Sequence, residues 1–146
     1  MANVFEFVIP GAPRTKKTHN QLVVSHHGGQ RLLPSQQFRA WNQEAQMWLA
    51  KVRSETRGLP LAQPVNCKAL FFRDAFRGDA CGYYQALADA LEEARIVVND
   101  CLIVSWDGSR LLKDHLSPRI EVRLSATGEE WTAETHGSMF TKGGGG

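Results

Sequence analysis

The sequence predicts one α+β domain with a mixed β-sheet and two main helices. Apolar residues recur at steps of three and four along two segments, about 35–55 and 80–95, which is the spacing of one helix face. Shorter runs rich in β-branched and aromatic residues stand between turn-forming pairs, which is typical of strands. The 146 residues suffice for one hydrophobic core and are few for two, so we expect a single domain over residues 1–126.

The chain opens with a predicted strand that Pro10-Gly11 ends. Its β-branched and aromatic residues are Val4, Phe5, Phe7, Val8 and Ile9. The following segment, 11–29, is mostly basic and polar, with a short apolar interruption at residues 22–24. We interpret it as a basic loop with room for a short hairpin.

The first predicted helix, about 35–55, begins after Ser35, which is a good N-cap residue. Gly58 and Pro60 follow its end. Its opposite face is polar and mostly basic. The apolar stripe that we expect to face the core consists of Phe38, Trp41, Ala45, Trp48 and Val52.

A second strand is predicted at 65–72 and a second helix at 80–95, with Asp79 able to cap the first turn. Short β-type runs follow at 96–98, 102–106, 110–112 and 120–124, each separated by turn residues. We therefore expect a second half rich in hairpins. Residues 127–146 are polar and end in a glycine run, and we expect a flexible C-terminal tail there.

Charge is unevenly distributed along the chain. Residues 1–60 hold eight Lys and Arg against three acids, and the remainder holds nine against twelve. The basic half is a candidate phosphate-facing surface, although a solvated basic face is the commoner outcome. The three cysteines form no CxxC pair, and no apolar run is long enough for a membrane span. We expect reduced thiols, a cytoplasmic location and no membrane partner.

Two carboxylates far apart in the sequence could converge on one site. Asp79 follows a predicted strand and begins a helix, and Asp100 precedes a strand. Carboxylate oxygens suit hard divalent cations such as Mg²⁺ or Mn²⁺. The plainer interpretation of the same pattern is an ordinary helix cap at Asp79 and a turn residue at Asp100.

Residues 73–113 carry three landmarks in register: Asp79 at the start of the second predicted helix, Asp89-Ala90-Leu91 towards its end, and Asn99-Asp100 before a strand. This pattern resembles that of the RusA family of Holliday-junction resolvases, in which these positions hold the first acid, the helix end and an acidic pair. The resemblance extends to Ile9-Pro10-Gly11-Ala12-Pro13 with Lys16-Lys17, and to the segment 34–41. It covers residues 4 to about 124.

The resemblance implies a metal-dependent endonuclease that resolves branched DNA by paired symmetric phosphodiester hydrolysis and works as a homodimer. The implied cofactor is Mg²⁺ or Mn²⁺, which would polarise the phosphate and help to deprotonate the attacking water. The implied catalytic and metal-binding residues are Asp79 and Asp100, with the position of Cys81 as a further candidate. Candidate phosphate contacts are Arg14, Lys16, Lys17, Arg73, Arg77 and Lys113.

The chain departs from the family pattern at four positions: Cys81 replaces the second acid, Gly82 an Asn, Gln85 a Lys, and Asn99 one member of the acidic pair. A thiol is a poor ligand for Mg²⁺, and Gln85 cannot offer a phosphate positive charge. Asp74 and Glu93 are candidate replacements. An alternative interpretation is therefore a branched-DNA-binding protein of the same fold with impaired catalysis, and a third is a protein-interaction domain that no longer binds nucleic acid.

Aromatic residues near this segment are candidates for stacking on unpaired bases. They are Tyr83, Tyr84 and Trp106, and helical spacing favours core packing for at least one tyrosine. His26-His27, followed by two glycines, is more typical of an exposed turn than of a metal site.

Overall fold

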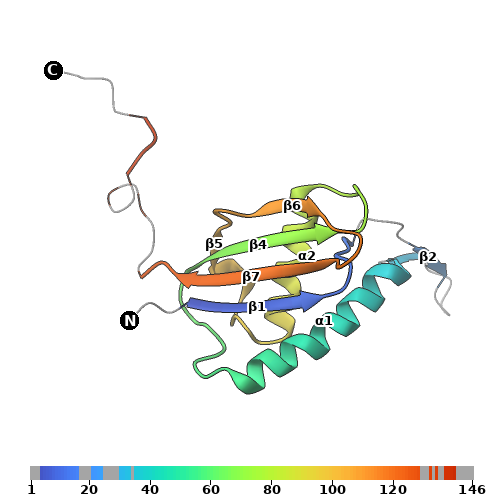
Figure 1. The fold of residues 1–146 in the computed structure, drawn as a ribbon, viewed down its shortest axis with the longest axis horizontal. Helices are drawn as coiled ribbons and strands as arrows, with labels where there is room; N and C mark the ends of the chain where they lie inside the picture. The colour runs from blue at the N-terminus through green and yellow to red at the C-terminus, as the bar shows by residue number, and fades with distance from the viewer. Residues whose placement is uncertain are drawn as a thin grey trace.

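The computed structural model describes residues 4–16, 21–24, 30–33, 35–128, 132, 134 and 137–140. The strands are β1 (Val4–Pro10), β2 (Gln21–Val24), β3 (Gln30–Leu33), β4 (Val65–Arg73), β5 (Ile103–Ser105), β6 (Arg110–Lys113) and β7 (Arg119–Ala126). The helices are α1 (Gln36–Glu55), α2 (Ala80–Glu93) and a short 3-10 turn, η1 (Asp100–Leu102). The predicted α+β class with two main helices is confirmed (Figure 1).

The main sheet is mixed, as predicted, and β4 lies near its centre. The strand order is β1-β7-β4-β5, and β6 also pairs with β4. β7 pairs antiparallel with both β1 and β4, whereas β5 and β6 pair parallel with β4 (Figure 1). β5 meets the beginning of β4, at Val65 and Asn66, and β6 meets its end, from Leu70 to Arg73.

The prediction of a second half rich in hairpins is wrong for the strands that the structure describes. β5 and β6 each pair with β4, and β7 lies between β4 and β1 instead of beside β6. β5 and β6, and likewise β6 and β7, therefore do not pair as hairpins. A hairpin does form from the basic segment 11–29, but it extends beyond it, because β2 within the segment pairs antiparallel with β3, which follows it.

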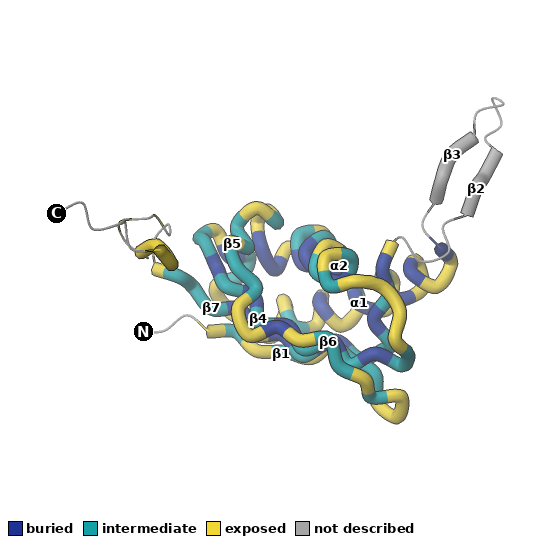
Figure 2. The backbone as a smooth tube through the Cα atoms, turned by 90° about the horizontal axis from the view of Figure 1, so that it is seen from above, coloured by how far each residue is buried: buried dark blue, intermediate teal, exposed yellow. Residues whose placement is uncertain are grey.

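Both long helices cover the same face of the main sheet (Figures 1 and 2). Alternate residues of β4 are buried from Val65 to Arg73, which is the pattern of a strand with one face in a core. The core between sheet and helices contains Ile9, Phe38, Trp41, Leu49, Val65, Phe71, Tyr83, Leu87, Leu91, Ile120 and Leu124. The other face of the sheet carries Glu6, Val8, Lys68, Leu70 and Arg123.

The cap of α1 is confirmed, and one member of its predicted stripe is wrong. The Phe38 amide donates to Ser35 Oγ at 3.1 Å. Leu49 is fully buried, whereas Trp48 is 41% exposed. Positions 48 and 49 are three and four residues after Ala45, so both neighbour it on the helix surface and spacing alone does not choose between them.

The β-type run at 96–98 is not a strand. Arg95, just after the C-cap Ala94 of α2, adopts φ 61°, and the Ile96 amide donates back to the Leu91 carbonyl at 2.9 Å, as in a helix C-terminal motif. Ile96 and Val97 are buried and make only an isolated bridge to Leu61 among the described residues. No helix in the described part of the chain is long and apolar enough to cross a membrane.

Candidate functional site

A pocket of about 350 Å³ lies between the first half of α2 and the segment that leads into β5. It brings together Cys81 and Gln85 from the helix with Asp100 from η1. The remaining lining residues are Tyr84, Ala88, Ile103 and Trp106. Three positions singled out from the sequence therefore share one pocket, although they lie on two different elements, α2 and η1.

Asp79 caps α2 as the plainer interpretation predicted. Its Oδ1 accepts the Gly82 amide at 2.8 Å, and Asp79 is not among the residues that line the pocket. A Cβ at position 82 would lie 3.0 Å from that oxygen and 3.2 Å from Thr15 Cγ2. Gly82, a departure from the family pattern, thus permits the buried Thr15 to pack against the first turn of α2.

Asp100 is positioned by its neighbours on both sides. The Asn99 side chain accepts the Cys101 amide at 2.9 Å and caps η1, so Asn99 has a local structural role. The Asp100 amide donates to Glu92 Oε1 of α2 at 3.2 Å. The Asp100 side chain has no hydrogen-bond partner among the described residues, which leaves its carboxylate available in the pocket.

Gln85 is engaged by the next turn of its own helix. Its Nε2 donates to Asp89 Oδ1 at 2.8 Å, and Lys16 Nζ forms an ion pair with the other oxygen of Asp89. Asp89, Gln85 and Cys81 recur at steps of four and lie along one face of α2. Lys16 therefore reaches this face from the segment after β1.

The donor atoms fit a hydrated cation better than one enclosed by protein. Among the described residues no group of three or more His, Cys, Asp or Glu side chains is arranged to hold a metal ion. Asp74 and Glu93, the candidate replacement ligands, do not line the pocket. Asp74 forms hydrogen bonds with Arg14, and Glu93 accepts a hydrogen bond from Asn42. Mg²⁺ commonly keeps several waters and binds through one or two carboxylates, and Asp100 supplies one here.

Arg14 is held by Asp74 through two parallel hydrogen bonds. Arg14 Nη1 and Nη2 each lie 3.0 Å from one carboxylate oxygen of Asp74. The hydrogen bond from Arg14 holds the pKa of Asp74 below its usual range. This candidate phosphate contact therefore joins the segment after β1 to the β4–α2 loop.

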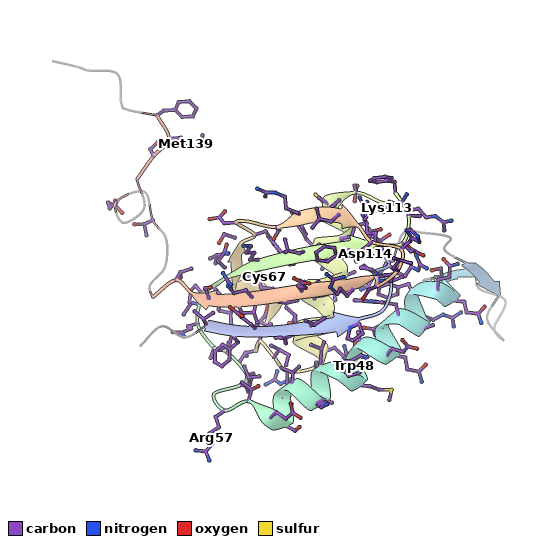
Figure 3. The ribbon with its side chains drawn as sticks, in the orientation of Figure 1. Trp48, Arg57, Cys67, Lys113, Asp114 and Met139 are labelled. Carbon is purple, nitrogen blue, oxygen red and sulfur yellow. The ribbon has the colours of Figure 1, made fainter. Side chains whose placement is uncertain are left out.

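Arg73, Arg77 and Lys113 gather where β4 and β6 end. Arg73 pairs in register with Lys113, and Lys113 lies at that end of the sheet in Figure 3. Arg73 is buried and donates to the carbonyls of Leu112 and Arg77, at 3.2 and 3.3 Å. Arg77 and Lys113 are exposed and form no ion pair with any residue in the described ranges.

The three candidate stacking aromatics are all engaged within the fold. Tyr83 is buried, and its hydroxyl donates to the Arg77 carbonyl. Burial raises the pKa of Tyr83, which keeps that donor protonated. Tyr84 and Trp106 stack on each other with centroids 4.5 Å apart and ring planes within 5°.

Sequence reasoning missed Phe76 and Glu92 as parts of the site, and it named Trp106 as a candidate for base stacking and not as a pocket wall. Phe76 is a 74% exposed ring beside Arg73 and Lys113. Glu92 binds the Asp100 backbone, and Trp106 forms a wall of the pocket. The phenylalanine could have been found as a large apolar residue in a basic loop, whereas the roles of the other two depend on tertiary contacts. Lys17, His26 and His27 lie outside the described residues.

A scan against protein-family models finds no match to this chain, and a search of the curated proteins finds no matching relative.

Proposed function

We propose that this protein is a metal-dependent endonuclease of the RusA type that cuts branched DNA, including four-way junctions, as a homodimer. The observation that supports the proposal most is the pocket shared by Cys81, Gln85 and Asp100. These are three of the positions at which the sequence aligns with the family's acidic and basic residues. Their convergence from separate elements is what a catalytic site requires.

Asp100 is the pocket residue that suits a site acting on a phosphodiester. Asp100 offers a carboxylate that no described side chain occupies. A bound Mg²⁺ or Mn²⁺ would polarise the scissile phosphate and lower the pKa of an attacking water. One carboxylate oxygen of Asp79 accepts the cap hydrogen bond, so its other oxygen is the one that would bind a metal ion.

Positive charge on the loop before α2 and at the end of β6 supports a polyanionic substrate. Arg77 lies on the β4–α2 loop and Lys113 ends β6, and neither forms an ion pair within the described part of the chain. Lys and Arg side chains that contact phosphates release counterions, so binding weakens steeply with salt. A homodimer with twofold symmetry would present two such sites to the two sides of a junction.

The direct test is cleavage of a synthetic four-way junction in Mg²⁺ or Mn²⁺. We expect symmetric nicks from the wild-type chain, and loss of cleavage with retained junction binding in Asp79→Asn and Asp100→Asn. Asp107→Asn is the matched control, because Asp107 is an exposed carboxylate outside the pocket. Equal cleavage by wild type and Asp100→Asn would place the chemistry elsewhere.

A second candidate is a branched-DNA-binding protein with impaired catalysis. Cys81 favours it, because a thiol stands in the pocket where the family pattern has a carboxylate. The absence of a three-ligand cluster in the described residues also favours it. Binding of junction DNA without metal-dependent cleavage is its expected result.

A further inference from the structure

An exposed phenylalanine stands among cations at the tip of the β4–α2 loop. Phe76 is 74% exposed, far more than an aromatic residue placed for packing within the chain. Arg73 Cζ lies 5.2 Å from its ring centroid and Lys113 Nζ lies 5.3 Å from it. Both distances are within the range of cation–π attraction.

The two cations come from paired positions on one face of the sheet. Arg73 and Lys113 are paired in register on neighbouring parallel strands, so their side chains leave the sheet in the same direction. Arg73 is itself buried, so one of the two cations beside the ring is anchored within the fold. The rest of the aromatic surface faces solvent.

The loop that carries Phe76 is held at both ends. Asp74 is bound by Arg14 through two hydrogen bonds, and the Arg77 carbonyl accepts from both Arg73 and Tyr83. Gly78 adopts φ 76°, and a Cβ there would lie 3.2 Å from Thr15 and from Tyr83. An exposed ring on a fixed loop loses little conformational entropy when it binds.

We propose that Phe76 stacks on an unpaired nucleobase while Arg77 and Lys113 contact the adjacent phosphates. The partner must combine a planar apolar face with negative charge, and a nucleotide combines both. The loop leads directly into α2, whose first turns carry Cys81 and Gln85 of the pocket. The inference rests on the proposed function and extends it, since it assigns recognition of the branch point to this ring.

The test measures the binding of wild type and variants to two junctions that differ at one nucleotide of the crossover. One junction has an unpaired thymine at that position, and the other has an abasic analogue. We expect Phe76→Ala to weaken binding of the thymine junction roughly five- to 150-fold, the range for loss of one stacked base. We expect no comparable loss on the abasic junction. Phe76→Trp should restore binding, whereas Phe76→Leu should not.

Leu116→Ala is the control, because Leu116 is an 86% exposed apolar side chain on the neighbouring β6–β7 loop. Unchanged junction binding by Phe76→Ala, with wild type still preferring and cutting junctions, would overturn the stacking role and leave the proposed function standing. Wild-type protein that binds no DNA would overturn both. Binding to phosphatidylserine vesicles that is lost in Phe76→Ala, with DNA binding intact, would assign the ring to an anionic lipid surface instead.

Discussion

Arg14 and Asp74, 60 positions apart in the chain, form a two-pronged ion pair with both N–O distances at 3.0 Å. The pair fastens the segment after β1 to the loop that precedes α2. It thereby fixes the loop of Phe76 and, through Thr15, the first turn of the helix that lines the pocket. Arg14 is thus a structural residue as well as a candidate phosphate contact.

Replacing either partner should destabilise the fold modestly. We expect Arg14→Leu and Asp74→Asn each to lower the free energy of unfolding by about 1 kcal/mol, since bidentate geometry strengthens the pair while solvent around the 37% exposed Asp74 weakens it. A double-mutant cycle in urea measures the coupling. Additive effects of the two substitutions would show that the pair contributes nothing.

The same pair predicts a dependence of stability on acid pH. The folded-state pKa of Asp74 lies below its unfolded value, so the stabilisation is present above about pH 4 and is lost as pH falls through the folded pKa. Asp74→Asn should therefore lose less stability than wild type between about pH 5 and pH 2. Unfolding curves at several pH values in that window test this difference.

Arg77 and Lys113 should govern the salt dependence of DNA binding. Each contact with a phosphate contributes about 0.9 to the slope of log affinity against log salt. We expect Arg77→Gln and Lys113→Gln each to reduce the slope by about one. Arg123→Gln is the matched control, because Arg123 pairs with Glu6 on the open face of the sheet. An equal reduction in the control would indicate a diffuse charge effect.

Ser109 should be important for stability although the turn that carries it is short. Its hydroxyl donates to the Cys67 carbonyl at 3.1 Å and accepts the Ala69 amide at 3.0 Å, filling the edge of β4 between β5 and β6. Ser109→Ala leaves a buried amide unpaired and should cost about 1–3 kcal/mol in thermal or urea unfolding. The exposed Ser117→Ala should change stability little.

The three thiols should differ in reactivity. Cys67 is fully buried, and burial raises the pKa of its thiol, whereas Cys81 and Cys101 are exposed. In the native protein an alkylating reagent should label Cys81 and Cys101 and spare Cys67. Junction DNA should slow labelling of Cys81 more than of Cys101, because only Cys81 lines the pocket. Equal rates with and without DNA would remove the pocket from the DNA interface.

The parts of the fold that depend on neighbouring residues were predictable from the sequence. Ser35 and Asp79 cap the two helices because an N-cap needs only a side-chain oxygen and the amides of the next turn. Strand pairing was not predictable in the same way, because the parallel pairing of β5 and β6 with β4 depends on how the chain crosses the sheet. The incorrect expectation of hairpins arose because the order of the strands in the sheet does not follow from their order in the sequence.

The candidate site likewise has one part that was predictable from the sequence and another that depends on tertiary contacts. The positions of Cys81, Gln85 and Asp100 came from the resemblance of the sequence to the RusA pattern, and they share a pocket. The stacking of Tyr84 on Trp106 and the bond between Glu92 and the Asp100 backbone join elements distant in the sequence. No periodic pattern encodes such contacts, so the sequence could not reveal that Trp106 forms a wall of the pocket.

The measurement that tests the central claim most directly compares the wild-type chain with Cys81→Asp in junction cleavage over a titration of Mg²⁺ and Mn²⁺. We expect metal-dependent symmetric nicks by wild type, with Cys81→Asp cutting at a lower metal concentration because it adds a carboxylate to the pocket. Wild-type protein that binds junctions and never cuts them, while Cys81→Asp does, would contradict it and establish a DNA-binding protein with an impaired site.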